Sequence, residues 1–453
     1  MNFEDKKVLV VGAGKSGIAA FNLLDEKKAQ TILFDSNANI DKKAIEEQLN
    51  KGFCGKVVFG ELTEEIKKDL DYVVLSPGVP TDLAFVNELR DQGVPILGEI
   101  ELAYQFSKGK IAAITGTNGK TTTTTLVGEI MKTYYESVFV VGNIGVPYTQ
   151  MVEETKENSV TVAEMSSFQL ETVINFRPDV SAILNLTPDH LNRHHTMEAY
   201  VNAKLRITEN QTASDYCILN YEDALLQEAA KHITTNIVWF SSSHILDQGL
   251  YLKGDDIVYN DGSCEKVIIN IHELQIFGRH NYENVMAAIG VTMFMNVPVE
   301  DIRKALMAFK GVEHRIEYVT TKHGVKYYND SKGTNPDAAI QAIKAMQTKT
   351  LLIAGGYDKD SEYDEWIKAF DGKVNYLVLL GQTREKIKVA AERLGVKNIV
   401  LVDSLKEAVD FCAEHANPGE SVLLSPCCAS WGMFKNYEER GCMFKDYVHE
   451  IEE

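Results

Sequence analysis

Short, uninterrupted runs rich in Val, Ile and Leu recur along the 453 residues of this chain, separated by amphipathic stretches of helical length. A strand that is apolar along its whole length, rather than at alternate positions, is buried on both faces, as in parallel sheets covered by helices. The pattern therefore predicts an α/β fold. The clearest runs are 8–11, 32–34, 72–75, 111–114, 160–163, 180–186, 351–354, 376–380, 399–402 and 422–424.

The length predicts about three domains, and the alternation of strands and helices restarts twice. Residues 1–98 predict an N-terminal Rossmann-like domain whose strands end in turns rich in Gly and Ser. Residues 99–311 carry most of the polar motifs and predict a central P-loop ATPase-like domain with a mostly parallel sheet and a peripheral hairpin region at 241–272. Residues 312–453 predict a C-terminal Rossmann-like domain.

The charge balance argues against several kinds of partner. Lys and Arg total 46 against 65 Asp and Glu, a formal net charge of −19, so bulk charge would not attract nucleic acid or an anionic membrane. No apolar run approaches the roughly 18–20 residues of a membrane span, and no signal-peptide core opens the sequence. We therefore expect a cytoplasmic protein without membrane insertion. The seven cysteines include no C-x-x-C pair, which predicts buried, reduced thiols.

The first glycine loop is GAGKSG. Gly12, Gly14 and Gly17 follow one predicted strand, and Asp35 ends the next. This is the dinucleotide fingerprint, in which glycines let the backbone approach a diphosphate and the acid binds a ribose hydroxyl. On this pattern alone, an NAD enzyme, a site for another nucleotide and tight packing without a ligand all stay open.

A second loop lies within IAAITGTNGKTT at 111–122, between a predicted strand and a predicted helix. Its backbone amides could surround phosphate groups, Lys120 could reach the outer phosphates, and the Thr121 hydroxyl could bind Mg²⁺. The full Walker sequence is absent, because Ile114 stands at its first glycine position. The loop nevertheless favours a nucleoside triphosphate site over a turn with a solvated lysine.

Acidic residues at neighbouring strand ends are the expected partners of such a loop. Glu164 ends one predicted strand, and Asp189 and His190 follow another, so all three are expected at the sheet edge where ligands bind. The sequence HLNRHH also raises the hypothesis of a zinc site, but no matching set of Cys or His accompanies it. We interpret His190 as the functional histidine and expect His194 and His195 at the surface.

In their order and spacing, the motifs of this chain resemble those of the Mur ligase family. The members of this family are ATP-dependent amino-acid ligases of peptidoglycan precursor synthesis. The matching motifs extend over nearly the whole chain and are TGTNGKTT, AEMSSFQLE, LNLTPDHLNRH, AYVNAKLRI, FGRHNYENVMAA, GVEHRIE and YNDSKGTNP. The GAGKSG loop, SPGVP at 76–80 and the segment 425–441 resemble the branch that adds D-glutamate to UDP-N-acetylmuramoyl-L-alanine. The alternatives are another Mur-type ligase, a folate polyglutamating enzyme and an NAD-dependent oxidoreductase.

The resemblance implies an ATP-dependent amide-forming ligase and gives residues their roles by position. The implied catalytic residues are Lys120, Glu164, His190, Lys204 and Arg315. The implied ATP-binding residues are Gly116, Thr117, Asn118, Gly119, Lys120, Thr121, Thr122, Asn281, Asn284, Arg315 and Asp330. Two Mg²⁺ ions are implied, and their ligands would be Thr121, Glu164, His190 and Lys204, the last as a carbamate.

The resemblance also implies two substrate sites in a chain expected to be a monomer. The implied UDP-sugar residues are Ser16, Asp35, Ser36, Ser76, Gly78, Asn143, Ser166 and Gln169. The implied D-glutamate residues are His314, Lys332, Thr334, Lys359, Ser430 and Tyr437. Tyr437 stands where relatives often have Phe, and GGYDKD at 355–360 departs from the commoner GGxGK form. With these roles, the first glycine loop would bind a uridine nucleotide instead of NAD.

Overall fold

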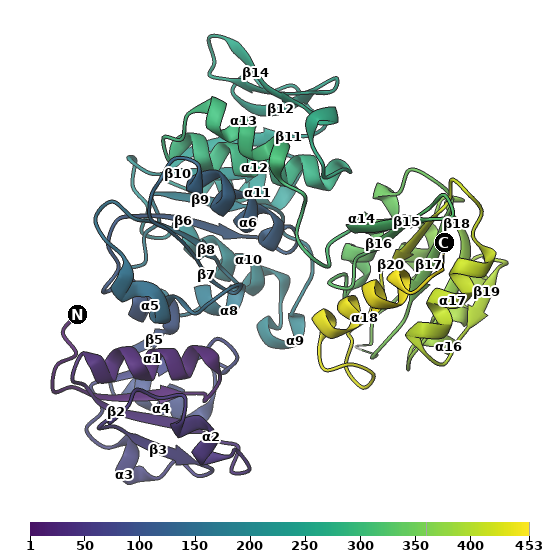
Figure 1. Ribbon diagram of the computed structural model, residues 1–453. Coiled ribbons are helices and arrows are strands. Elements are labelled where there is room, and N and C mark those ends of the chain that lie inside the picture. The colour runs from purple at the N-terminus through teal and green to yellow at the C-terminus, as the bar shows by residue number, and fades with distance from the viewer. Residues whose placement is uncertain (359, 453) are drawn as a thin grey trace. The chain divides into compact units, whose positions relative to one another are not determined.

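The computed structural model describes residues 1–358 and 360–452 and contains three mainly parallel sheets (Figure 1). Contacts within the chain define two compact units. The first unit comprises Met1–Glu273 with Glu283–Ala308, and the second comprises Leu274–Tyr282 with Phe309–Glu453. Of the helices in the described part of the chain, none combines the length and the hydropathy that a bilayer crossing requires.

The first sheet is wholly parallel, with the strand order β3-β2-β1-β4-β5 of a Rossmann-like domain. Along β1, Val8 and Val10 pack into one buried cluster with α1, while Leu9 and Val11 pack into another with α4. This burial on two faces is why the run is apolar throughout. The elements are β1 (Lys7–Val11), α1 (Lys15–Glu26), β2 (Gln30–Asp35), α2 (Lys42–Glu46), β3 (Lys56–Phe59), α3 (Glu64–Lys67), β4 (Tyr72–Leu75), α4 (Ala84–Asp91), β5 (Ile96–Gly98) and α5 (Glu99–Tyr104).

The second sheet has nine strands in the order β14-β13-β12-β11-β10-β9-β6-β8-β7. Strands β6 to β12 are parallel, and the central strands β8 and β9 are buried along their whole length, as predicted for a P-loop domain. The strands are β6 (Lys110–Thr115), β7 (Val138–Gly142), β8 (Val160–Glu164), β9 (Val180–Ile183), β10 (Tyr216–Asn220), β11 (Asn236–Ser241), β12 (Gly249–Lys253), β13 (Asp256–Asn260) and β14 (Glu265–Asn270). The helices are α6 (Lys120–Lys132), α7 (Tyr148–Met151), α8 (Ser167–Leu170), α9 (Leu191–His194), α10 (Met197–Leu205), α11 (Ala224–Ala229), α12 (Arg279–Phe294) and α13 (Val299–Ala308).

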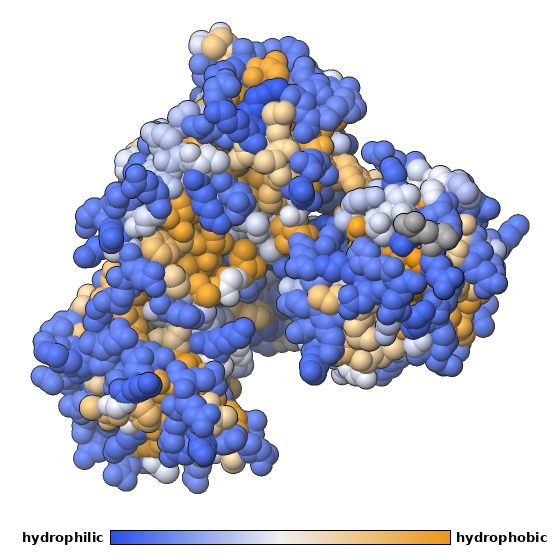
Figure 2. Space-filling view, in the orientation of Figure 1, coloured by the Kyte–Doolittle hydropathy of each residue, from blue (hydrophilic) through white to orange (hydrophobic). Residues whose placement is uncertain are grey.

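The edge strands β12, β13 and β14 pair antiparallel, which confirms the hairpin region expected at 241–272. A small patch of hydrophobic residues appears near this edge in the space-filling view (Figure 2). Val267 of β14 is exposed. Four short 3₁₀ turns complete this part of the chain and are Val152–Glu154, Arg206–Thr208, Ala230–His232 and Ile271–Glu273.

The third sheet has the order β15-β16-β20-β17-β18-β19, and only β15 runs antiparallel to its neighbour. Leu352 and Ala354 of β17 pack with α14, α15 and α16, whereas Leu351 and Ile353 pack with α17 and α18. This is the second Rossmann-like domain that the sequence predicted. Its elements are β15 (Glu317–Lys322), β16 (Val325–Asn329), α14 (Pro336–Ala345), β17 (Thr350–Ala354), α15 (Asp364–Lys368), β18 (Val374–Leu379), α16 (Arg384–Arg393), β19 (Ile399–Leu401), α17 (Leu405–His415), β20 (Ser421–Leu424) and α18 (Tyr437–His449).

Two expectations need correction. The run 180–186 forms a strand only as far as Ile183, because the following residues leave the ladder to bond the loop after β6. Of the seven cysteines, all free, Cys54, Cys264 and Cys442 are exposed, so the expectation of uniformly buried thiols was wrong.

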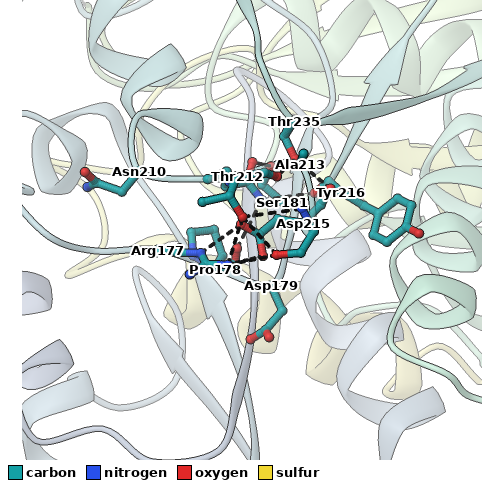
Figure 3. Close-up of polar contacts among 12 residues, drawn as sticks. Arg177, Pro178, Asp179, Ser181, Asn210, Thr212, Ala213, Asp215, Tyr216 and Thr235 are labelled. Atoms are coloured by element: carbon teal, nitrogen blue, oxygen red, sulfur yellow. Dashed lines mark hydrogen bonds and ion pairs between the residues drawn. The ribbon is translucent and has the colours of Figure 1, made fainter.

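A polar network lies at the amino ends of β9, β10 and β11 (Figure 3). Arg177 donates from Nε and a terminal nitrogen to the two carboxylate oxygens of Asp215, at 2.8 and 3.0 Å. Thr212 donates its backbone N–H to the same carboxylate, and the Thr235 hydroxyl donates to the Asp215 carbonyl. Burial alone would raise the pKa of the Asp215 carboxyl, but the hydrogen bonds from Arg177 and Thr212 outweigh it and lower the pKa.

Replacing Arg177, which is partly exposed, with alanine should lower the free energy of unfolding by about 2 kcal/mol at pH 7, because the buried Asp215 would lose hydrogen bonds to its charged carboxylate. Urea unfolding followed by circular dichroism measures this change. As a control, Lys231→Ala removes an exposed pair with Glu228 and should cost less than about 1 kcal/mol.

The pH dependence of the Arg177→Ala effect has a definite sign. Because the folded pKa of Asp215 lies below its ordinary value of 3.8, the pair stabilises the fold above that pH and ceases to do so as the pH falls through the folded pKa. The difference in free energy of unfolding between the unmodified protein and Arg177→Ala should therefore be constant from pH 6 to 8 and shrink below about pH 4. A difference that grows on acidification would contradict the assignment.

Candidate active site

The loop between β6 and α6 has the backbone of a phosphate-binding turn. Gly116 and Gly119 have φ values of 147° and 86°, and α6 begins at Lys120 directly after Gly119. A Cβ atom on Gly119 would lie 2.2 Å from Oδ1 of Asn284, so a side chain there would displace the loop. The helix therefore presents its first backbone N–H groups at the carboxyl edge of the sheet, where they can bind an anion.

The loop is tied to the segment after β9. Asn118 donates its N–H to the Asn185 side chain at 2.8 Å, and the Asn185 amide donates back to the Asn118 carbonyl at 3.0 Å. Thr117 donates its N–H to the Asn185 carbonyl, and its hydroxyl lies 2.9 Å from the Tyr200 hydroxyl. These hydrogen bonds within the chain hold the loop in its turn. Lys120 donates from Nζ to the carbonyls of Gly116 and Thr117, at 2.9 Å each.

Glu164 ends β8, the strand beside β6, as the sequence predicted. The side chain is 1% exposed, and Oε1 accepts a hydrogen bond of 2.7 Å from the Asn143 amide. Oε2 is buried and accepts no hydrogen bond from the described residues. A buried carboxylate oxygen without a donor is costly unless a cation binds it, so this oxygen fits the hard oxygen ligand that Mg²⁺ prefers.

Lys204 of α10 is 2% exposed, so it is a buried lysine and does not lie on the surface of its helix. Its Nζ donates to the Gly116 carbonyl at 2.8 Å and lies 4.9 Å from the centre of the Tyr200 ring. Burial, together with the nearby Lys120 ammonium, lowers the pKa of Lys204 well below its ordinary value. Glu164 and Asp189 act electrostatically on the same amine, so the structure brings these predicted residues together.

The histidines after β9 differ from expectation in one respect. His190 is exposed and has φ 54°, and its ring lies 3.6 Å from the Asp189 carboxylate and 4.8 Å from the Phe168 ring centre. His195 is exposed as expected, but His194 is buried. Its ring lies 2.9 Å from the Ser167 hydroxyl and 3.2 Å from Glu171, and burial lowers its pKa. The surface expectation for His194 was wrong, because α9 packs this side chain against α8.

The predicted UDP-sugar residues of the first sheet gather around the carboxyl ends of β1, β2 and β4. Asp35 accepts backbone hydrogen bonds of 2.9 Å from Ala13, in the glycine loop, and from Asn37. The Ser76 hydroxyl donates to the Gly12 carbonyl, and a Cβ on Gly12 would lie 2.8 Å from Ser76. Asp35 therefore fixes the loop as well as offering an acceptor to a ligand. Ser16 is partly buried, and Ser36 and Gly78 are exposed.

The middle domain adds Asn143, Ser166 and Gln169 to this set. Ser166 and Gln169 form a reciprocal capping box at the start of α8. A small cavity is lined by Ser76 from the first sheet and by Gln169 and Phe168 from α8. The structure thus brings together predicted residues of the two domains, although they lie more than 90 residues apart in the sequence.

In the second unit, Asp330 follows β16 and is fully buried. Its Oδ2 accepts a hydrogen bond of 2.8 Å from Ser425, and its Oδ1 lies 3.9 Å from the guanidinium of Arg315. Burial raises the pKa of Asp330 to about 6, although Arg315 and Ser425 act against this. Asn281, also of this unit, is buried and donates to the Phe277 carbonyl at 2.9 Å, whereas Asn284 belongs to the first unit.

The predicted amino-acid site brings His314, Lys332 and Tyr437 together. The His314 and Tyr437 ring centres are 6.1 Å apart, and Lys332 Nζ lies 5.4 Å from the Tyr437 ring centre. Ser430 is buried in the turn before α18, and Thr334 is partly buried between Lys332 and α14. Lys359, the least regular match in the sequence, lies outside the described residues.

Sequence reasoning missed three polar residues that organise these sites. They are Asn185 beside the phosphate loop, Asn329 beside His314, and Arg440 of α18. Arg440 is 2% exposed and donates to the Ser331 hydroxyl and carbonyl and to the Cys428 carbonyl. In the sequence, only the position of these three residues within the family motifs indicated that they matter. Their hydrogen-bond partners are up to 109 residues away, so local patterns do not reveal the contacts.

Three family models match the chain, described as Mur ligase MurD-like, N-terminal domain (residues 6–98), Mur ligase middle domain (114–292) and Mur ligase, glutamate ligase domain (314–428). A UDP-N-acetylmuramoylalanine--D-glutamate ligase of Lachnoclostridium phytofermentans is 70% identical over 453 residues, covering 100% of both chains. One of the same name from Lachnospira eligens is 53% identical over 451 residues, again with full coverage.

Solved structures share the fold at low sequence identity. A UDP-N-acetylmuramate-alanine ligase, MurC, from Thermotoga maritima has a TM-score of 0.61 at 19% identity, covering 98% of this chain and 99% of the other. A MurF ligase from the same organism, solved in complex with ADP, has a TM-score of 0.59 at 18% identity, with coverage of 98% and 96%.

Proposed function

Because this chain belongs to the Mur ligase family of ATP-dependent, amide-forming enzymes, we propose that it joins D-glutamate to UDP-N-acetylmuramoyl-L-alanine and releases ADP and phosphate. This reaction is a step of peptidoglycan precursor synthesis. The observation that carries the proposal is the 70% identity, over the full length of both chains, with a ligase of that name. The loop before α6 supports it independently, because it lies beside the buried Glu164, whose Oε2 accepts no hydrogen bond from any residue that the structure describes.

The chemistry needs an activated carboxylate, because the oxygen of a free carboxylate is a poor leaving group. The alanyl carboxylate would attack the γ-phosphorus of ATP, giving an acyl phosphate and ADP. The glutamate amine would then attack the acyl carbon and expel phosphate, losing one proton as the amide forms. In the first step two anions meet, and unit charges about 4 Å apart repel by roughly 4 kcal/mol at an effective dielectric constant near 20.

Residues of the first unit are suited to offset this repulsion. The amides at the start of α6 and the Lys120 ammonium would bind the phosphates of ATP. Thr121, Glu164, His190 and a carbamate on Lys204 would hold two Mg²⁺ ions, which when bound neutralise phosphate charge. The buried, hydrogen-bonded position of the Lys204 amine supports the carbamate, since the neutral amine is the form that adds CO₂ with loss of a proton.

We assign the three substrates to the three domains, each of which is built around one sheet. We assign the UDP-sugar to residues 1–98 with Asn143, Ser166 and Gln169, ATP to residues 99–311, and D-glutamate to residues 312–453. Arg315 and Asp330 would act on the ATP phosphates from the last of these. We further propose a cytoplasmic monomer, because both nucleotide substrates are cytoplasmic metabolites and each substrate has its residues within one chain.

Phosphate release with Mg-ATP, UDP-N-acetylmuramoyl-L-alanine and each of D-Glu, L-Glu, L-Ala and L-Lys tests the proposal. Release should require both the sugar nucleotide and D-Glu. Release with a different amino acid would keep the ligase mechanism and refute the D-glutamate assignment. If folded protein releases no phosphate with the sugar nucleotide and any of the four amino acids, the proposed reaction is refuted.

A further inference from the structure

The imidazole of His314 is held in place from several sides. His314 has φ 63°, a backbone conformation that non-glycine residues seldom adopt. Its N–H donates to Glu317 at 2.9 Å, and its carbonyl accepts a hydrogen bond of 3.1 Å from the N–H of Lys332. Gly441 of α18 makes room for the ring, since a Cβ there would lie 2.2 Å from Nδ1. Such local strain, maintained by surrounding contacts, is typical of functional positions.

The side-chain amide of Asn329, at the end of β16, lies against the same ring. Its Nδ2 is 2.9 Å from His314 Nδ1, 3.0 Å from the Glu317 carboxylate and 3.3 Å from the Gly441 carbonyl. Its Oδ1 accepts a hydrogen bond of 3.1 Å from the N–H of Ser331. A carboxylate and a carbonyl can only accept, and a backbone N–H can only donate, so these partners determine which end of the amide faces the ring.

The amide nitrogen has two protons for three acceptors, and its two shortest contacts are those to His314 Nδ1 and Glu317. Because this nitrogen cannot accept, Nδ1 has to be the acceptor, which places the imidazole proton on Nε2. We propose that Asn329 is a positioning residue that locks His314 in the Nε2–H tautomer, so that His314 donates a hydrogen bond from Nε2 to a carboxylate of the incoming amino acid. The tautomer rests on geometry alone, whereas the identity of the acceptor rests on the proposed function.

The surroundings of Nε2 favour a substrate carboxylate as the acceptor. Within the described residues Nε2 makes no hydrogen bond, since the Glu313 carboxylate is 3.9 Å away. Lys332 Nζ and the His314 ring both lie near the ring of Tyr437, so a cation and an N–H donor are close to the same aromatic side chain. Burial lowers the pKa of His314, despite the opposing effect of Glu313 and Glu317, and so favours the neutral ring.

The same tautomer argues against two other roles. Glu313, His314 and Cys442 offer ligand atoms within 4.8 Å of one another, but a metal would need a lone pair at Nε2, and the Lys445 ammonium already contacts Glu313. A general base that takes the proton of the glutamate ammonium would also need a free lone pair. Nδ1 is occupied by Asn329 and Nε2 carries a proton, so neither nitrogen is available.

Two variants separate a donor from a base. In His314→Gln the terminal amide nitrogen reaches the place of Nε2 and still donates, whereas in His314→Asn the shorter amide reaches only the place of Nδ1. We expect the KM for D-glutamate to rise less than about fivefold in the first and more than about tenfold in the second, as for loss of one hydrogen bond to a charged group. A kcat for His314→Gln reduced 10²-fold or more, as expected for a lost base, or equal effects of both variants, would overturn the proposal.

The tautomer of His314 can be determined by NMR, without an activity assay. Long-range ¹⁵N–¹H spectra of the full chain labelled at its 11 histidines distinguish Nε2–H from Nδ1–H rings, and the His314 signal is the one lost in His314→Gln. The unmodified protein should show Nε2–H at pH 7.5. Asn329→Asp replaces the donor with an acceptor and should move the proton to Nδ1, with a D-glutamate KM raised about tenfold or more.

An Nδ1–H or doubly protonated ring in the unmodified protein would overturn the proposal even if the enzyme is fully active. A different result would refute the proposed function. In that case the unmodified protein would show the expected tautomer but would release no phosphate in response to D-glutamate. Gly441→Ala is the geometric check: alanine favours the helix, but its Cβ should displace the ring and raise the D-glutamate KM as in His314→Asn.

Discussion

Lys120→Ala should reduce D-glutamate-dependent phosphate release by about 10³-fold or more while leaving the affinity for UDP-N-acetylmuramoyl-L-alanine within a few-fold. The loss is large because a cation at a phosphate site stabilises charge that develops in the transition state. The ammonium bonds the carbonyls of Gly116 and Thr117, which belong to its own loop, so the variant should fold. Steady-state kinetics and calorimetric titration with the sugar nucleotide measure the two effects.

Lys132→Ala is the matched control for this prediction. Lys132 is the last residue of the same helix, and its exposed ammonium pairs with Glu129. Its replacement changes the net charge equally and should leave both turnover and sugar affinity nearly unchanged. If folded Lys120→Ala loses affinity for the sugar nucleotide, the assignment of sugar and ATP to different domains is wrong.

Strands were the most predictable part of the fold. Residues such as Val8 and Leu9 pack on opposite faces of one strand. A strand that is buried on both faces needs apolar residues at every position, so it can be recognised in the sequence as an unbroken apolar run. The ends of most such strands were predictable too, although the run 180–186 extends beyond β9, and this is why the sequence alone places Glu164 and the glycine loops at the carboxyl edges of their sheets.

Side-chain partners were much less predictable. Lys204 lies in a helix whose sequence gives no sign of burial, and the carbonyl that it bonds belongs to Gly116, 88 residues earlier. His194 lies in a four-residue helix, which is too short for a periodic pattern to reveal its buried face. Only three-dimensional packing brings these residues to their partners.

The same distinction applies to residues that shape the sites. Asn185 bonds the loop after β6, and Asn329 contacts the ring of His314, which precedes β15. Short-range sequence patterns contain no information about such contacts. Ser166 and Gln169 were predicted as sugar ligands, yet their capping box was also readable from the S-x-x-Q spacing. Their local role is therefore known, while their role as ligands stays a prediction.

Lys204→Ala should lower turnover by about 10²-fold or more, and short carboxylic acids such as formate or acetate should restore part of it. The buried amine donates to the Gly116 carbonyl and the Thr115 hydroxyl, and its lowered pKa favours the neutral form that adds CO₂. The resulting carbamate would place a carboxylate near Glu164. Alanine removes that charge and leaves space that a small carboxylate can enter.

Lys120→Ala provides the control, because it disables the same site without removing a proposed carboxylate. Acids that rescue Lys204→Ala should leave Lys120→Ala inactive, and ¹³C-labelled bicarbonate should give a carbamate signal in unmodified protein that is absent from Lys204→Ala. Full activity of Lys204→Ala without any acid would refute the carbamate. Equal rescue of both variants would show that the acids act elsewhere, since only one variant lacks a carboxylate at the metal site.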